Sequence, residues 1–430
     1  MKKIISNKSL ILIFLLAVVM AAPVRADLKL DGFMQGLYGG RLDEKNPTSS
    51  EQTANESRLQ LRLEQINDKS EFFGRLDFTY DGTRDGQNND NYIWELREAY
   101  LKTRLGSHID LKLGRQIMTW GTGDLIFIND AFAKDYRSFF IGRDDQYLKA
   151  PQNALRMEYY GGIGSVALIW TPRFEPNRLP DGRTLSYFNP FSGTIVGTGM
   201  GEQYYFAPAL PPAKFENGEW ASRFSRTVGT FNAALYFYKG FYKNPNGAIM
   251  TPEGPMPIFP KLNLYGASLR GPLAGGIVWL EGGYYDSRQD RGGQNPLMPN
   301  SSTSGLAGFE RQIATNLTVN AQWQVDIMSS YDTYKAQQTG MHAYVRDEVY
   351  HLFTSRITKL LHSELVTVSS FVFYSPTDED LYARLSTEYK YTDQVTFAVG
   401  ANIFDGKHDA TSFGQFRRDD NVYLKVTYNY

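Results

Sequence analysis

The stretch that decides the fold reads Thr318-Val319-Asn320-Ala321-Gln322-Trp323-Gln324-Val325-Asp326-Ile327. Its odd-numbered positions are apolar and its even-numbered positions are polar. Because successive side chains of a strand point to opposite faces, this period of two predicts a β-strand with one apolar and one polar face. Residues 58–64, 394–403 and 421–430 follow the same pattern. We therefore expect a sheet whose two faces meet different surroundings.

The connections between such segments alternate in length. Short turns are expected near residues 67–70, 105–108, 161–164, 229, 271–276, 316, 361–363 and 393. Long polar loops are expected near residues 41–54, 81–91, 117–151, 172–221, 244–260, 287–305, 329–346, 375–379 and 405–419. Short turns on one rim and long loops on the other are typical of outer-membrane barrels. The prediction is an all-β, closed antiparallel transmembrane barrel of about 18 strands (16–20 compatible), with short periplasmic turns, long extracellular loops and both chain ends on the short-turn side.

Composition supports a barrel in lipid. The chain has 28 Tyr, 27 Phe and 6 Trp, no Cys and a net charge of −1. A soluble β-sandwich also alternates, but it would turn its apolar face inward and need fewer aromatic residues. No later stretch approaches the roughly 20 apolar residues of a spanning helix. In lipid every backbone polar group must be paired, so a sheet has to close on itself. The near-neutral charge argues against a nucleic-acid partner.

The first 26 residues predict a signal peptide. Lys2, Lys3 and Lys8 precede an apolar run from Leu10 to Met20, and residues 24–26 end in Ala26 as a cleavage site. The alternative, a membrane anchor, is disfavoured because a run of about 11 residues is too short to span. Residues 27–430 are then the barrel, secreted to the outer membrane of a Gram-negative bacterium.

The last strand carries a second targeting signal. Apolar or aromatic residues occupy alternate positions up to the terminal Tyr430, as in final strands presented to the barrel-insertion machinery. The expected partners are that machinery, outer-membrane lipid, lipopolysaccharide and a small-solute substrate. The sequence does not reveal the oligomeric state.

If the apolar face meets lipid, the opposite side chains line the lumen. The pore-lining candidates are Arg58, Arg62, Arg75, Arg97, Glu95, Arg384 and Glu388. Glu95 and Arg97 are both candidates on the fourth expected strand, and we expect only one of them to face inward unless a bulge intervenes. The early arginines could form a basic ladder that attracts anions, or could simply pair with carboxylates on adjacent strands. The sequence leaves both readings open.

The 117–151 loop is the candidate constriction. Its length is unusual for a hairpin connection, and long structured loops are often functional. Its apolar residues include Leu125, Phe139 and Phe140, which need burial. We expect the loop to fold into the lumen; a cap over the external rim is the alternative. Its charged candidates are Asp124, Asp130, Arg137 and Arg143.

Leu113-Gly114-Arg115-Gln116, followed by Trp120-Gly121 and Asp124, resembles a run shared by porin-like outer-membrane barrels loosely related to the alginate-export barrels. The resemblance covers roughly 40 residues, and the alginate exporters are 18-stranded barrels, so it implies a barrel channel. The chain does not show a dense arginine lumen along its length, which a polyuronate exporter would need. The cargo therefore stays open.

Motifs for catalysis are missing from the sequence. It has no Cys and only 5 His, and it shows neither a His-Glu-x-x-His pattern nor a nucleophile elbow. We expect no enzyme activity, no metal and no cofactor. The predicted function is a porin-like channel for diffusion of small polar or ionic solutes. The alternatives are a non-conducting surface barrel of the adhesin or receptor type, and a polysaccharide-export barrel.

Overall fold

A computed structural model describes residues 28–43, 45–84, 89–200, 207–338 and 344–430. The predicted signal peptide and its cleavage site at Ala26 lie outside these ranges. None of the helices in the described ranges is both long enough and apolar enough to cross a bilayer.

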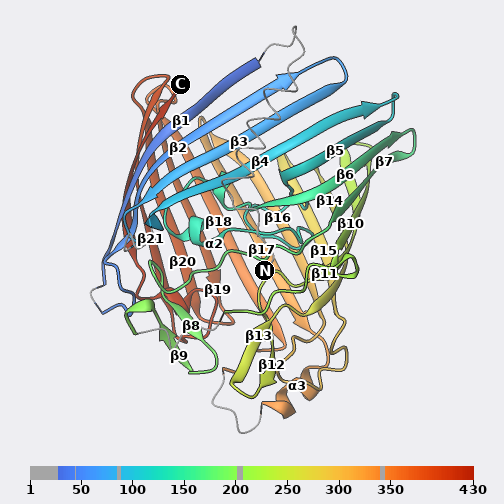
Figure 1. Ribbon diagram of the computed structural model, residues 1–430, viewed down its shortest axis with the longest axis vertical. Helices are drawn as coiled ribbons and strands as arrows, with labels where there is room; N and C mark the ends of the chain where they lie inside the picture. The colour runs from blue at the N-terminus through green and yellow to red at the C-terminus, as the bar shows by residue number, and fades with distance from the viewer. Residues whose placement is uncertain (1–27, 44, 85–88, 201–206, 339–343) are drawn as a thin grey trace.

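Eighteen antiparallel strands form one closed sheet (Figure 1). They are β1 (Leu28–Arg41), β2 (Gln52–Ile66), β3 (Ser70–Asp81), β4 (Tyr92–Leu105), β5 (Ile109–Ile117), β6 (Pro151–Gly161), β7 (Gly164–Thr171), β10 (Glu219–Val228), β11 (Phe231–Phe241), β14 (Lys261–Leu273), β15 (Gly276–Ser287), β16 (Ser302–Ala314), β17 (Leu317–Met328), β18 (Val349–Leu361), β19 (Val366–Ser375), β20 (Asp380–Lys390), β21 (Val395–Gly406) and β22 (Asn421–Asn429). Each strand pairs with the next, and β1 also pairs with β22, from Phe33 opposite Asn429 to Arg41 opposite Asn421. Closure removes both sheet edges, and the predicted fold and strand number are confirmed.

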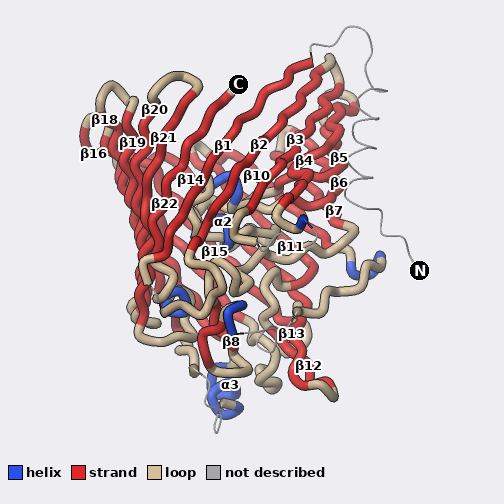
Figure 2. The backbone as a smooth tube through the Cα atoms, turned by 60° about the vertical axis from the view of Figure 1, so that its left-hand side comes forward, coloured by secondary structure: helices blue, strands red, loops and turns tan. Residues whose placement is uncertain are grey.

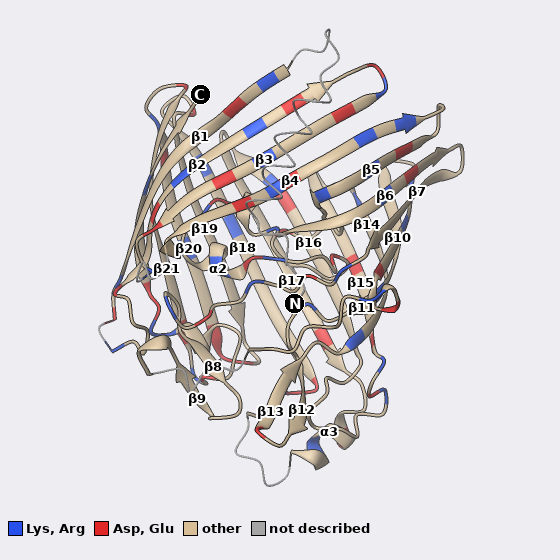
Figure 3. Cartoon of the chain, viewed as in Figure 1, with Lys and Arg blue, Asp and Glu red and all other residues tan. Residues whose placement is uncertain are grey.

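Alternation along each strand separates an apolar outer wall from a polar interior. On β17 the side chain of Trp323 is 43% exposed on the outside, whereas Asn320 is only 2% exposed on the inside. On β22 the same alternation leaves the side chains of Val422, Leu424 and Val426 exposed on the outside. This inside-out pattern is that of a barrel surrounded by lipid. Figure 3 shows Lys, Arg, Asp and Glu spread along the front strands β1 to β5.

The connections alternate as predicted. Short turns join β2 to β3, β4 to β5 and the later pairs at one end, and the last strand also finishes there. The other end carries all the long connections, including two small hairpins, β8 (Tyr187–Asn189) with β9 (Thr194–Val196) and β12 (Gly247–Thr251) with β13 (Gly254–Ile258), and the helix α3 (Tyr331–Gln337). We refer to these as the short-turn end and the long-loop end.

The long connection from β5 to β6, residues 118–150, lies inside the barrel. It contains the short helix α2 (Tyr136–Phe140), which is surrounded by wall strands in both views (Figures 1 and 2). Below we call residues 118–150 the inserted segment. It packs two buried clusters of apolar side chains against the inner wall.

A bulge breaks the alternation on β4. Arg75 of β3 pairs with Glu98, while its neighbour Leu76 pairs with Leu96, so Arg97 is the extra residue. The shift lets Glu95, Arg97 and Glu98 all direct their side chains to the interior, where each makes an ion pair. A bulge is the exception that the sequence had allowed for at this point.

Candidate functional site

A glycine is required within β5, close to the point where the chain leaves the wall. Gly114 has φ +131°, and a Cβ there would lie 2.2 Å from the carbonyl oxygen of Ala99. The next two side chains fix the strand end: Arg115 pairs with Glu175 at 3.0 Å, and the amide of Gln116 donates to the Ala154 carbonyl at 3.0 Å. The Gly-Arg-Gln run therefore fixes the end of β5, from which the inserted segment starts.

Aromatic packing holds the middle of the inserted segment against β20 and β21. The ring of Phe140 lies 5.3 Å from Tyr382 and 5.5 Å from Phe404, and Phe139 lies 5.5 Å from Tyr382. All four residues are buried. Edge-to-face pairs of this kind add to the free energy of burying the rings.

A carboxylate of β15 holds the first part of the segment. Glu281 accepts hydrogen bonds from the backbone N–H groups of Thr122, Gly123 and Asn129, and from the side chains of Thr122 and Asn129. The neighbouring Gly266 leaves the room this needs, because a Cβ there would lie 1.7 Å from the Asn129 Oδ1. One side chain thus satisfies three backbone donors that a buried loop would otherwise leave unpaired.

Tyr147 joins the end of the segment to β2 and β3. Its hydroxyl donates to Asp77 at 2.7 Å and accepts from the Gln60 amide at 3.0 Å. The guanidinium groups of Arg58 and Arg97 lie 4.0 and 4.6 Å from the centre of its ring. Both guanidinium groups are therefore within the range of a cation–π interaction with this buried ring.

Two further ion pairs connect the segment to the wall. Arg143 forms a bidentate pair with Glu56 of β2, and Asp144 pairs with Lys425 of β22. Burial acts to raise the pKa of Asp144, but the Lys425 ammonium outweighs it and leaves the pKa below its ordinary value. Because the pKa is depressed, this contact persists at mildly acidic pH.

A cluster of four charged residues beside the segment is open to water. Asp124 pairs with Arg356 at 3.0 Å, Asp145 pairs with Arg384 at 2.6 Å, and Asp145 and Arg356 are 3.8 Å apart. The side chains of Asp145 and Arg356 are 46% and 27% exposed. Burial raises the pKa of Asp124 above its ordinary value, against the lowering effect of Arg356. We call Asp124, Asp145, Arg356 and Arg384 the charged cluster.

The early arginines do not form a ladder of unpaired cations. Arg58 lies 3.2 Å from Asp77, Arg62 lies 3.2 Å from Glu64, and Arg75 pairs with Glu98. Arg97 is 1% exposed and lies 3.7 Å from Glu95. Of the two readings that the sequence left open, the structure shows pairing with carboxylates: Arg58 and Arg75 pair across adjacent strands, whereas the Arg62–Glu64 and Arg97–Glu95 pairs lie within one strand.

The remaining predicted residues lie apart from the cluster. Asp130 is buried within the segment, where it pairs with Lys134 at 2.9 Å. Arg137 pairs with Asp181 of the next long connection at 3.1 Å. Glu388 lies on the inner face of β20 toward the short-turn end and is partly buried. Of the predicted candidates, the structure brings Asp124 and Arg384 together in the charged cluster and pairs Glu95 with Arg97 on β4.

Sequence reasoning missed the wall residues that receive the segment, chiefly Glu281, Gln322 and Arg356. Gln322 accepts from the Asp124 N–H and donates to its carbonyl, both at 2.8 Å. Strand parity identifies all three as inward-facing, but parity alone gives no height within the lumen. The described residues contain no group of three or more His, Asp or Glu side chains that could hold a metal ion.

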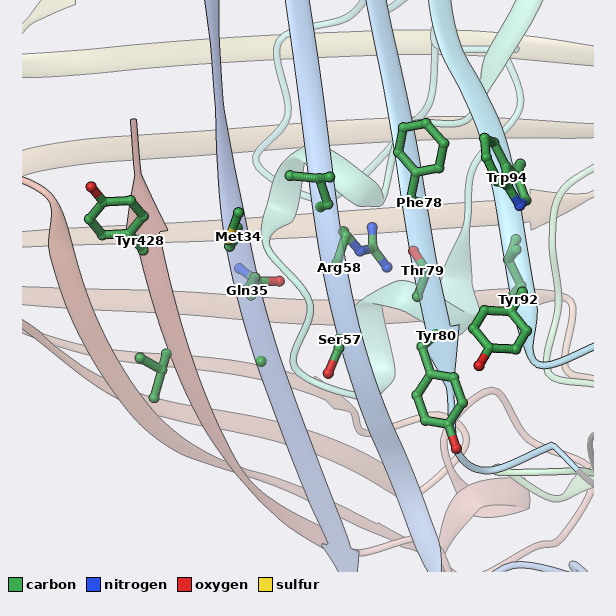
Figure 4. A pocket seen from close by; sticks show the side chains of 14 residues that line it. Met34, Gln35, Ser57, Arg58, Phe78, Thr79, Tyr80, Tyr92, Trp94 and Tyr428 are labelled. Atoms are coloured by element: carbon green, nitrogen blue, oxygen red, sulfur yellow. The ribbon is translucent and has the colours of Figure 1, made fainter. Parts of the chain in front are cut away.

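A hollow of about 610 Å³ lies on the membrane-facing surface of the barrel (Figure 4). It forms on the outer wall where Gly36 has no side chain and that of Ser57 is small. Met34, Trp94 and Tyr428 surround it and are exposed on the outside of the barrel. In a bilayer this surface contacts lipid, so the hollow is separate from the lumen.

The sequence of this chain matches a known protein family. Residues 25–378 match the family described as Protein of unknown function (DUF1302). The chain belongs to the DUF1302 family. No curated protein matches this DUF1302 member in sequence.

Solved structures share its fold. OccK8 (OprE) of Pseudomonas aeruginosa is similar with a TM-score of 0.55 and 9% identity, over 94% of this chain and 98% of that one. OccAB3 of Acinetobacter baumannii is similar with a TM-score of 0.54 and 10% identity, over 94% and 99% of the two chains. At these identities the likeness shows a common porin-like barrel fold.

Proposed function

We propose that this DUF1302 protein is an outer-membrane channel through which small polar or ionic solutes diffuse, and that the inserted segment is its constriction. The long-loop end faces the cell exterior and the short-turn end faces the periplasm, as in other outer-membrane barrels. No chemical step or cofactor is involved.

The observation that carries the proposal is the charged cluster. A segment that merely filled the barrel would bury its ion pairs, as it does at Asp130 and Lys134. Asp145 and Arg356, which lie 3.8 Å apart inside the barrel, instead remain 46% and 27% exposed. Water therefore reaches the narrow region, and the charged side chains exposed there can orient polar solutes.

A non-conducting surface barrel is the alternative from another class. It would use the long loops alone, and it gives no reason for a water-exposed charged cluster inside. The resemblance to alginate-export barrels rests on residues 113–124, whose role in this chain is to turn and fix the inserted segment. It supports a channel and does not identify a cargo.

Liposome swelling tests the proposal. Refolded mature protein in liposomes should admit arabinose and glucose, with rates that fall steeply for disaccharides and larger sugars. Liposomes without protein, and liposomes with heat-denatured protein, serve as controls. If correctly folded protein admits no solute of any size, the barrel is not a diffusion channel.

A further inference from the structure

A large apolar hollow lies at the long-loop end, directly over the inserted segment. Its volume is about 890 Å³, within the range of small-molecule sites. Of its 31 lining residues, 11 are Phe or Tyr. The inserted segment contributes Phe127, Tyr136 and Phe140, and the 172–218 connection contributes Phe188 and Leu210. We call this hollow the aromatic basin.

The basin presents no free charge among its described lining residues. Its one charged member, Asp181, is held by Arg137 at 3.1 Å and by Arg183 at 3.2 Å. Its other polar members are neutral, such as Asn177 and Gln415, and these also bond to the protein: Asn177 to Asn244 at 2.7 Å and Gln415 to the Phe188 N–H at 3.2 Å. An ion that entered would lose hydration without meeting an opposite charge.

A solute with an apolar ring system would gain from the same surroundings. Rings bury apolar area against Phe and Tyr, and they stack or meet edge to face with them. On its way into the barrel such a solute would meet two parts of the inserted segment in turn. Phe139 and Phe140 line the floor of the basin, while Asp145, a few residues on, belongs to the charged cluster.

We propose that the aromatic basin is a binding site for amphipathic solutes that carry an apolar ring system and a small polar group. The proposal rests on the proposed channel function and specifies its substrate class. The ring docks in the basin first, and the polar group is then passed to the charged cluster on the other side of the segment. The channel is accordingly selective for ring-containing organic solutes over sugars of similar size.

Calorimetric titration with 2-naphthol, on mature protein in amphipol, tests the site. Wild-type protein should show one saturable site. In the double variant F188S/L210S the affinity should fall about tenfold, since two apolar contacts are removed. The matched control is F215S, because Phe215 is 74% exposed at the same end of the barrel but does not line the basin. It should bind like the wild type.

Folding of the variants does not obscure the result. Leu210 is 54% exposed, so L210S alone should fold normally and still weaken binding by about threefold. Equal affinity in wild type, F188S/L210S and F215S would overturn the proposal, as would the lack of a saturable site in wild-type protein. Ion conductance without 2-naphthol is measured on the same samples. A conducting protein that does not bind contradicts the basin alone, whereas a silent protein that binds contradicts the channel alone.

Discussion

Replacing Glu281 with alanine should detach one part of the inserted segment, residues 122–129, from the barrel wall; we call this part the arc. The Glu281 carboxylate accepts three backbone and two side-chain hydrogen bonds from residues 122–129, and the two from Asn129 are buried. Hydrogen bonds to a charged acceptor contribute roughly 1.5–3 kcal/mol each, but lumen water can replace those near the surface. Counting only the two buried bonds gives a loss of about 3–6 kcal/mol for the attachment of this arc.

A loss of about 3 kcal/mol raises the population of the detached arc by more than a hundredfold. The rest of the segment stays in place, because its aromatic packing and the Arg143 and Asp144 ion pairs are untouched. E281A should therefore fold, conduct more than the wild type and show larger current noise in a planar bilayer. The E281Q variant keeps an acceptor oxygen, so its conductance and current noise should lie between those of the wild type and those of E281A.

The matched control is E71A. Glu71 also carries an inward carboxylate, but it accepts from Tyr100 near the short-turn end rather than from the segment. Its conductance should stay close to that of the wild type. If E281A folds and its conductance and noise equal those of the wild type, the Glu281 contacts do not hold the constriction.

Three more predictions follow from single contacts. Because the pKa of Asp124 is raised, its carboxylate takes up a proton early on acidification, and the loss of this negative charge beside Arg356 should increase the anion preference of the channel as pH falls. The D124N variant should show the higher anion preference already at pH 7.5, and its preference should change less with pH. Reversal potentials measure the preference. An unchanged pH response in D124N would refute this. F140A removes a buried ring between Tyr382 and Phe404 and should cost about 3–5 kcal/mol, seen as a lower Tm; an unaltered Tm would show that the packing is not needed. G114A places a Cβ against the Ala99 carbonyl at positive φ and should cost at least ~2 kcal/mol, so normal yield and normal Tm on refolding would contradict the strain argument.

The wall of the barrel could be predicted from the sequence because each strand obeys a strict period of two. Residues 318–327 show this most plainly: on β17 the buried Asn320 and Gln322 alternate with the exposed Ala321 and Trp323. A register error of one residue would move charges such as Arg384 into lipid at a cost of about 2–4 kcal/mol. The register is therefore fixed by energy more strongly than the strand ends are.

The interior could be predicted only in part. The apolar residues of 118–150 indicated that the segment needs burial, but they did not indicate which inward residues receive it. Arg356 lies more than 200 positions from its partner Asp124, and nothing local in the sequence of β18 distinguishes it from other inward-facing residues. The buried pair of Asp130 and Lys134 could not be predicted either, because an i,i+4 spacing indicates contact only on a helix and residues 130–134 are not helical.

The aromatic basin was the least predictable feature. Its lining comes from several long connections, including residues 118–150 and 172–218, and their proline-rich stretches have no periodicity to read. Only the closed barrel brings Phe140, Phe188 and Phe413 to one hollow.

Single-channel conductance of the mature protein, with and without the inserted segment, tests the central claim most directly. Residues 122–148 are replaced by a short Gly-Ser linker, which leaves the strands β5 and β6 intact. We expect small, stable current steps from the wild-type protein and clearly larger steps from the shortened one, since the wall remains closed and the constriction is gone. Equal steps from both folded proteins, or no steps from either, would contradict a water-filled channel narrowed by this segment.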